Sequence, residues 1–471
     1  MQERKDLSAI TSYQKKQDFI TDITPIYETG KGLSRAVVEE ISRSKSEPQW
    51  MLDIRLRALE AFFSKPVPTW GADLSELKFD ELKYYTMPSE RKVNNWDEVP
   101  KEIKETFDKL GIPEMEKKYL AGSVAQFESQ GIYSRLRREW QDKGVIFTDM
   151  DTALREHPEI IKAYFGRIIP FSDNKFAALN TAVWSGGSFL YVPRGVVLDL
   201  PVQAYFRMNL SGEGQFERTL IIAEDGASVH YIEGCTAPRY SADSLHAAIV
   251  EVYVKDHARV RYTSVQNWSE NVINCPTKRA WVEEEGRMEW VQGSLGSKIT
   301  MTYPSSVLRG RGASASHLNV ALGIGNVWKE GGAKVIHAAP ETSSKVVAKS
   351  ISGNGGTSIY RGLLRINPGA YNSKASVQCD ALILDDHSKS NTYPHNEILE
   401  EKSAFSHEAY VGKISEEQVT YLMSRGIPED ESRSLIVLGF LDDVLREIPL
   451  EYSLEFNRLI RLEMSKLGAV G

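Results

Sequence analysis

Apolar residues recur with helical spacing along the first part of the chain. Ser34 is predicted to cap a first helix, and an apolar stripe with steps of three and four residues follows Pro48. That second helix should end before Pro66, because a proline disfavours helical geometry in the residue before it. Shorter helical patterns follow, and together they predict an N-terminal helical region over residues 1–165: 102–110, 114–126 and 152–165.

From about Phe176 the pattern changes to short alternating or apolar strands between turns rich in Gly, Ser, Thr and Asn. One phrase recurs loosely: a turn with glycine or a small polar residue, then a small residue, then alternation. Imperfect repetition at spacings of roughly 13 to 31 residues indicates a β-solenoid, which we place over residues 166–412. A β-sandwich is the competing interpretation. The phrase occurs at 225–231, 256–262, 285–290, 312–314, 332–335, 356–359 and 369–371.

Helical spacing returns near Ser415, which begins a capping box with Gln418 three residues later. This helix should stop at Gly426, and two further amphipathic helices are predicted after Pro428 and after Pro449. We therefore predict a C-terminal helical domain over residues 413–471. Helices this short cannot bury much apolar surface alone, so they either pack on the solenoid or receive a partner.

The composition is that of an ordinary globular protein, with 41% hydrophobic and 26% charged residues among 471. A formal net charge of −7 argues against a nucleic-acid-binding protein, which usually carries a basic surface. No stretch approaches the length of a membrane span, and the charged N-terminus has no apolar run behind it. These features predict a cytoplasmic protein with no membrane or nucleic-acid partner.

Common catalytic motifs are absent from the sequence. There is no phosphate-binding G-x-x-x-x-G-K-[ST] loop, no G-x-G-x-x-G after a strand, no H-E-x-x-H and no C-x-x-C. The segment 29–34 only imitates a phosphate-binding loop, because Gly32 follows Lys31 where Ser or Thr is required. We therefore do not expect this chain to hydrolyse nucleotides itself.

The three cysteines, Cys235, Cys275 and Cys379, are too few and too scattered for a disulfide framework. Isolated cysteines in such proteins are most often buried as small hydrophobic residues. Thiolates also bind iron–sulfur clusters and accept sulfane sulfur, but three distant thiols cannot make a complete four-thiolate site. They could supply part of a shared site that histidine or carboxylate ligands complete.

The remaining candidates are polar residues within segments predicted to be strands. His407 and Glu408 are adjacent, so they face opposite sides of a straight strand and could reach one metal ion only at a bulge or a strand end. A solvated strand end is the alternative. Two further pairs with i, i+2 spacing each share one face of a strand, which is either functional or a solvated outer face: Arg207 with Asn209, and Gln266 with Trp268.

Three long phrases, 176–189 (FAALNTAVWSGGSF), 215–222 (QFERTLII) and 233–238 (EGCTAP), closely resemble the SufB branch of the SufB/SufD family, as do the segments around Cys379 and His407. This family belongs to the SUF iron–sulfur cluster assembly system. The resemblance implies a right-handed parallel β-helix core with helical domains at both ends. It also implies a complex with the ATPase SufC, docked on the C-terminal helical domain, and with SufD at the edge of the core.

The resemblance also assigns residues. Cys235 matches the thiol that accepts persulfide sulfur, and a low-pKa thiol beside an arginine would suit that role. Ser406 stands where the family pattern has Glu, so a ligand role at that position is either lost or moved, with Glu397 as the candidate. Cys275 occupies a position where the family has an apolar residue and is read as incidental. The cluster or metal ligands are implied to be Cys379, His407 and Glu408, and the sulfur route to be lined by Arg207, Asn209, Gln266 and Trp268.

The leading prediction is a scaffold without turnover of its own that accepts sulfur and iron and holds a transient [4Fe–4S] or [2Fe–2S] cluster. A cysteine desulfurase with its sulfur-shuttle protein is the expected sulfur source, and a reduced flavin is left open as a further cofactor. The chain could also pair with itself as a homodimer. The rival predictions are a β-helix enzyme acting on polysaccharides and a purely structural subunit whose cysteines are inert.

Overall fold

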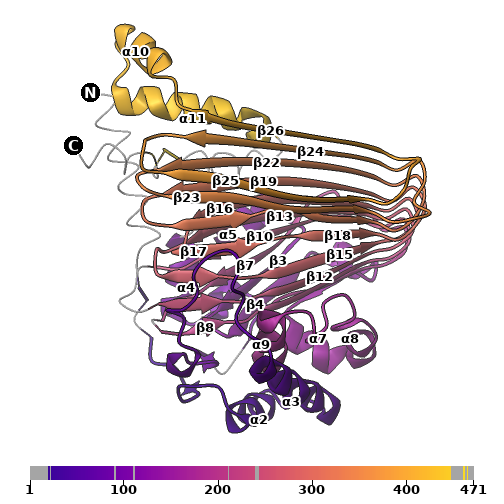
Figure 1. The fold of residues 1–471 in the computed structure, drawn as a ribbon. Helices are drawn as coiled ribbons and strands as arrows, with labels where there is room; N and C mark the ends of the chain where they lie inside the picture. Colours follow the sequence, from indigo (N-terminus) through magenta and orange to yellow (C-terminus); the bar gives the residue numbers. More distant parts are fainter. Residues whose placement is uncertain are drawn as a thin grey trace.

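The computed structural model describes residues 20–21, 23–89, 92–109, 112–210, 212–238, 243–446, 460–461 and 464. Its centre is a stack of parallel β-coils formed by a ten-stranded and a fourteen-stranded sheet (Figure 1). Helices α2 and α3 lie at one end of the stack, and α10 and α11 lie beside the last strands at the other end. No helix in the described part of the chain is long and apolar enough to cross a membrane.

Helices surround the first coils. Ser34 caps α2 as predicted, because its hydroxyl accepts a hydrogen bond from the Val37 backbone N–H at 3.3 Å. Helix α3 begins directly after Pro48 and ends at Ser64, before the prolines. The helices of this part are α2 (Arg35–Ser44), α3 (Gln49–Ser64), α4 (Lys101–Lys109), α5 (Ile112–Tyr119), α6 (Arg138–Gln141), α7 (Met150–Glu156), α8 (Pro158–Tyr164) and α9 (Lys175–Val183), with the 3₁₀ turns η1 (Phe79–Glu81) and η2 (Trp96–Glu98) and the short pair β1 (Tyr27–Glu28) and β2 (Thr86–Met87).

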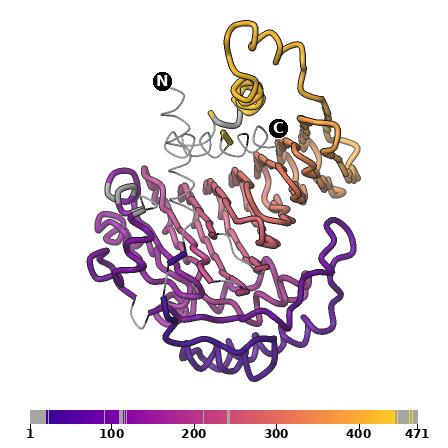
Figure 2. Tube along the Cα trace, turned by 90° about the vertical axis from the view of Figure 1, so that its left-hand side faces the viewer, coloured from indigo at the N-terminus to yellow at the C-terminus, as the bar shows by residue number. Residues whose placement is uncertain are grey.

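Each coil contributes one long strand to the ten-stranded sheet and two shorter strands to the facing sheet, so the interior between the sheets forms a narrow lumen. The ten-stranded sheet runs β4 (Gln130–Leu136), β3 (Gly122–Phe127), β7 (Val202–Arg207), β10 (Ser228–Thr236), β13 (Arg259–Trp268), β16 (Arg287–Gly296), β19 (Ser314–Ile324), β22 (Ser343–Gly353), β24 (Lys374–Ile383) and β26 (Ala404–Lys413). Figure 2 shows these coils stacked in the order of the sequence. The β-solenoid prediction is confirmed, and the β-sandwich alternative is wrong.

The fourteen-stranded sheet closes the other side of the lumen. Along its path, β23 joins two rows of short strands, because its first half pairs with β20 and its second half with β21. Its strands are β5 (Ile146–Thr148), β6 (Phe189–Val192), β9 (Arg218–Ala223), β12 (Ile249–Val254), β15 (Thr277–Val282), β18 (Ser305–Leu308), β21 (Lys334–His337), β23 (Thr357–Ile366), β20 (Trp328–Gly331), β17 (Ile299–Thr302), β14 (Val272–Asn274), β11 (Ser244–His246) and β8 (Gly214–Gln215), with β25 (Lys389–Ile398) paired to β23.

The recurring phrase marks the turn that enters each long strand. At this turn the backbone of one residue is left-handed in successive coils, which glycine adopts without strain, as at Gly226 and Gly312. The next residue is small because its side chain points into the bend, and Ala227, Ala258 and Ala313 are all buried. The sequence repeat therefore reflects a steric requirement of the turn.

Lumen-facing side chains stack from coil to coil because the register between strands is continuous. Tyr231, Tyr262 and Trp290 lie in register on β10, β13 and β16, and their ring centroids are separated by 5.0 Å at each step. His317 continues the ladder, and its ring centroid lies 6.4 Å from that of Trp290. These stacked aromatic rings form much of the core between the sheets.

The C-terminal helices cover the outer face of the ten-stranded sheet. Ser415 caps α10 (Glu416–Ser424) as predicted, and α11 (Glu429–Leu445) follows Pro428. Val437 and Leu441 of α11 pack in one apolar cluster with residues of the sheet such as Leu322. Packing on the solenoid is therefore confirmed. The predicted helix after Pro449 lies almost entirely outside the described residues.

Two features of the first half differ from the sequence pattern. Strands β3, β4 and β5 lie within the stretch predicted to be helical, and β3 occupies part of the predicted helix 114–126. Conversely, α9 lies where strands were predicted to begin. Because α9 is buried on all sides, apolar residues occur all around the helix. Its sequence therefore shows neither the alternation of a strand nor the period of a surface helix.

Replacing Trp290 by alanine should lower the free energy of unfolding by about 3–5 kcal/mol, the usual cost of removing a buried tryptophan side chain. Trp290 is 1% exposed and donates a hydrogen bond from Nε1 to Ser306 Oγ at 3.1 Å. Urea unfolding followed by circular dichroism measures the change. The control, Tyr410→Ala at a 60% exposed position, should change it by less than about 0.5 kcal/mol. Equal losses in both variants would contradict the stacked core.

Candidate functional site

The thiol of Cys379 lies near the end of the solenoid, on the lumen face of β24. Its Sγ is 3.7 Å from His407 Nε2 on β26, the last strand of the ten-stranded sheet. The two side chains share a face because β24 and β26 are in register, with Cys379 opposite Ala409 and Val377 opposite His407. Cys379 is buried and His407 is half-buried. The structure therefore brings these two predicted ligands together.

A second side chain reaches the thiol from the facing sheet. Tyr360 of β23 is hydrogen-bonded to Cys379. Burial raises the pKa of the Cys379 thiol to about 12, while the Tyr360 hydrogen bond opposes this rise and Asp380 adds to it. The free thiol is therefore protonated at neutral pH and becomes a thiolate when a metal ion binds it.

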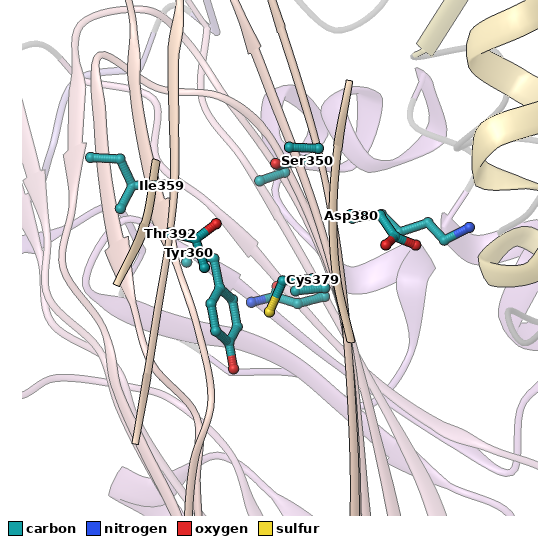
Figure 3. A pocket seen from close by; sticks show the side chains of 12 residues that line it. Ser350, Ile359, Tyr360, Cys379, Asp380 and Thr392 are labelled. Carbon is teal, nitrogen blue, oxygen red and sulfur yellow. The ribbon is translucent and has the colours of Figure 1, made fainter. Parts of the chain in front are cut away.

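The space beside Cys379 is small. Figure 3 shows Cys379, Tyr360 and Thr392 pointing into a common cavity, while Asp380 points to the other side of its strand. The cavity measures about 20 Å³, enough for about one water molecule. A metal cluster held by Cys379 must therefore extend beyond this cavity, toward the last strands, β25 and β26.

The remaining predicted ligands face away from Cys379. Glu408 is in register with Gln378, on the outer face of the sheet, and the register between β24 and β26 has no bulge that would turn it. Glu408 and His407 could therefore meet at one metal ion only around the edge of β26. Ser406 faces outward as well, opposite Ser376. Glu397 of β25 accepts a hydrogen bond from His395 at 2.8 Å, and its suggested ligand role stays a prediction.

Within the described residues, no group of three or more His, Cys, Asp or Glu side chains is arranged to hold a metal ion. Cys379 and His407 supply two donors of kinds that bind iron–sulfur clusters. A complete cluster site at this end of the lumen would need donors from another chain or from added ligands.

Cys235 lies deep in the lumen, on β10. It is in register with Gln266 of β13, and Trp268 lies two residues further along the same face. Burial and the nearby carboxylates of Glu233 and Glu217 raise the pKa of the Cys235 thiol well above its usual value. The expectation of a low-pKa thiol is therefore wrong for the chain on its own.

Arg207 and Asn209 occupy the other face of the same sheet. Arg207 is in register with Thr236 and donates a hydrogen bond from Nη1 to Thr236 Oγ1 at 3.0 Å, whereas Cys235 is opposite Phe206. Asn209 bonds to the backbone of Thr21 through its side chain, with distances of 2.8 and 2.9 Å. The structure thus places Gln266 and Trp268 beside Cys235 and separates Arg207 and Asn209 from it.

Glu233 is a charged neighbour of Cys235 that the sequence analysis missed. Its carboxylate accepts hydrogen bonds from Lys278 Nζ and Ser264 Oγ, both at 2.9 Å, and from the Tyr262 hydroxyl. The spacing of Glu233, two residues before Cys235, could have placed it in the lumen. Lys278 comes from the facing sheet, so no local pattern pointed to it, and the same is true of Tyr360.

A ladder of in-register side chains, polar except for Ala348, runs from Glu233 beside Cys235 to Cys379. Strands β10 and β24 are separated by β13, β16, β19 and β22, so Cys235 and Cys379 lie about 24 Å apart at the usual strand spacing. The lumen ladder that starts at Glu233 reaches Cys379 through these strands in register. Its intervening members are Ser264, Gln292, Asn319 and Ala348. Cys275 belongs to neither group and is buried in an apolar cluster beneath the N-terminal helices.

Two buried carboxyl groups lie next to Asn209. Glu128 accepts a hydrogen bond from the Asn209 backbone N–H at 2.7 Å, and Glu213 accepts one from Thr86 Oγ1 at 2.8 Å. Burial raises the pKa of Glu213 to about 7, and burial together with Glu213 raises the pKa of Glu128 well above its usual value. The pair therefore retains a proton at neutral pH and ties Thr86 to the first coils.

The free energy of unfolding should fall as the pH rises from 4.5 to about 7, and the Glu213→Gln substitution should make this fall smaller. A carboxyl group whose pKa is about 7 when folded and 4.5 when unfolded stabilises the fold fully below pH 4.5 and loses that stabilisation by about pH 7. The loss is about 3 kcal/mol. Urea unfolding of both proteins between pH 5 and 8 measures it, and parallel pH profiles would contradict the prediction.

Two family models together match most of the chain. The model described as the SUF system FeS cluster assembly SufBD core domain matches residues 206–440, and that of the SufBD protein N-terminal region matches residues 39–204. Two curated relatives are named iron-sulfur cluster assembly SufBD family proteins. The one from Staphylococcus aureus (strain MRSA252) is 55% identical and the one from Staphylococcus epidermidis (strain ATCC 12228) is 54% identical, each over 97% of this chain and 98% of the relative.

Proposed function

This chain belongs to the SufBD family of the SUF iron–sulfur cluster assembly system, and from that premise we propose that it is the SufB-type scaffold on which a transient cluster is built. The observation that carries the proposal is the pairing of the Cys379 thiol with the His407 imidazole beside the last strands of the solenoid. Both are ligands of iron–sulfur clusters, and a site with two protein donors suits a cargo that must later be released.

Incomplete ligation supports a site shared with a second subunit. The last strands, β25 and β26, have largely exposed residues, and among the described strands β26 is the last of its sheet. Tyr393, Tyr410 and Val411 are exposed apolar side chains on these strands. An exposed strand edge with apolar side chains favours pairing with another strand edge. We assign this edge to SufD, or to a second copy of this chain when SufD is absent.

Sulfur is proposed to enter at Cys235 and to reach Cys379 along the polar ladder of the lumen. Gln266 and Trp268 would contact the sulfur beside Cys235, while Arg207 and Asn209 would act from the other face of the same sheet. The raised pKa of Cys235 means that its thiol must lose a proton as it attacks the persulfide brought by a cysteine desulfurase and its shuttle protein.

The energy source would lie in a partner. The C-terminal helices expose Tyr421, Met423 and Leu435, which form an apolar contact surface for the ATPase SufC. The chain would act as a cytoplasmic assembly subunit without turnover of its own, and a reduced flavin could serve the complex as an electron donor. A purely structural role is the second candidate, because every described cysteine is buried.

Anaerobic reconstitution of the purified chain with ferric iron, a thiol reductant and sulfide tests the scaffold. Visible absorption and Mössbauer spectra should show a cluster in the wild type, with most of the signal lost in Cys379→Ser because a serine oxygen binds these clusters poorly. Cys275→Ser is the matched control, since it makes the same change in a buried apolar environment. Cys235→Ser should retain the reconstituted cluster, because sulfide supplied in solution bypasses the proposed sulfur acceptor.

The same spectra recorded with SufC and SufD present separate two explanations of a negative result. A cluster that forms only in the complex would show that the partner supplies missing ligands. Equal cluster content in wild type and Cys379→Ser within the complex would reject Cys379 as a ligand and favour the structural role.

A further inference from the structure

A second chain of hydrogen bonds reaches Gln266 from the facing sheet. His246 of β11 lies between Glu217 and Asn274, with its Nε2 3.0 Å from a Glu217 carboxylate oxygen and its Nδ1 2.6 Å from Asn274 Oδ1. Asn274 in turn donates from Nδ2 to Gln266 Oε1 at 2.7 Å. All four side chains are buried, so water does not compete for these bonds.

The direction of each hydrogen bond in this chain follows from its neighbours. An amide oxygen can only accept, so Asn274 Oδ1 requires a proton on His246 Nδ1. The NH₂ group of Asn274 then points toward Gln266, so the side-chain carbonyl oxygen of Gln266 accepts this hydrogen bond. The group that Gln266 can still offer to a ligand is its NH₂ group.

Glu217 fixes the protonation of the histidine. Burial alone would lower the pKa of His246, but the charge and hydrogen bond of Glu217 raise it. The other charged groups at this place are Glu233 of β10 and Lys278 of β15, which pair with each other at 2.9 Å. The His246 ring also packs 4.6 Å, centroid to centroid, from Trp268. His246 thus contacts Trp268 directly and reaches Gln266 through Asn274.

We propose that His246, held by Glu217, is a positioning residue for sulfur transfer: through Asn274 it orients the Gln266 amide so that its NH₂ group, not its oxygen, faces the sulfur on Cys235. This inference rests on the proposed role of Cys235 as sulfur acceptor. Gln266 is in register with Cys235 on the neighbouring strand, so the two side chains are adjacent. An NH₂ group stabilises an anionic persulfide sulfur in the lumen, whereas a carbonyl oxygen would repel it.

The transfer itself balances without an added reductant. The Cys235 sulfur attacks the outer sulfur of a donor persulfide, the donor S–S bond breaks, and the donor leaves as a thiol with the proton that Cys235 gives up. The products are a Cys235 persulfide and the donor thiol. Gln266 acts only by hydrogen bonding to the transferred sulfur.

Asn274→Asp tests the orientation with almost no change of shape. A carboxylate accepts from both sides, so Gln266 must turn its NH₂ group toward residue 274 and its oxygen toward Cys235. The full chain is treated with sodium polysulfide, and the persulfide on Cys235 is measured by alkylation and mass spectrometry. We expect about tenfold less persulfide, the effect of losing a hydrogen bond to a charged group. Asn391→Asp, the same change at an exposed position, is the control.

Two further variants distinguish orientation from folding. Glu217→Gln should reduce the persulfide on Cys235 less than Asn274→Asp does. The NH₂ group of the new glutamine can donate to His246 Nε2 and leave the proton on His246 Nδ1. The double variant His246→Phe/Glu217→Leu replaces the buried pair by apolar groups of similar size, a change that buried pairs often tolerate. It frees the Asn274 amide to turn, and its persulfide yield should fall between those of wild type and Asn274→Asp.

The positioning role would be overturned if a folded Asn274→Asp variant had wild-type persulfide levels, and Cys235 would remain the acceptor. If Asn274→Asp does not fold, the same result in the folded double variant would overturn it. Absence of persulfide from Cys235 in the wild type would instead reject the proposed function on which this inference rests.

Discussion

From β7 to β26 the protein depends on one constraint, the unbroken parallel register between successive long strands. Side chains of a strand alternate between two faces, so one register fixes which residues face the lumen in every coil. A shift by one residue would exchange the lumen and the outer face along a whole strand. The aromatic core, the polar ladder and both candidate thiols all follow from this single choice.

The same constraint explains why buried charges occur in pairs. The side chains that line the lumen are buried from bulk water, so each charged group must find its partner on the facing sheet or on the next coil. Glu233 meets Lys278 in this way, and Glu217 meets His246. Replacing one member would leave an uncompensated charge, which costs more than the intact pair contributes. The ladder near Cys235 is therefore a rigid environment in which hydrogen-bond directions are defined.

Much of the fold could be predicted because its signals are local. The caps at Ser34 and Ser415 and the small residue at each turn depend on a few neighbouring residues. The site was harder to predict because its members come from different coils and sheets. Spacing correctly warned that His407 and Glu408 diverge on a straight strand, and correctly put Gln266 with Trp268 on one face. It could not show that Arg207 faces away from Cys235, since that depends on the register between β7 and β10.

The two thiols differ in what surrounds them, and this difference bears on the order of events. Glu233 and Glu217 near Cys235 oppose a further negative charge, so under the proposed function sulfur bound to Cys235 would be favoured to move on once its proton is lost. Cys379 has a tyrosine and a histidine beside it and lies next to exposed strands, where iron can approach and a partner can add ligands. Under the proposed function, an enclosed acceptor at one end of the ladder and a thiol beside His407 at the other would favour transfer in one direction. The electrostatic environment of each thiol would set that direction, and the continuous register holds the two thiols at a fixed distance.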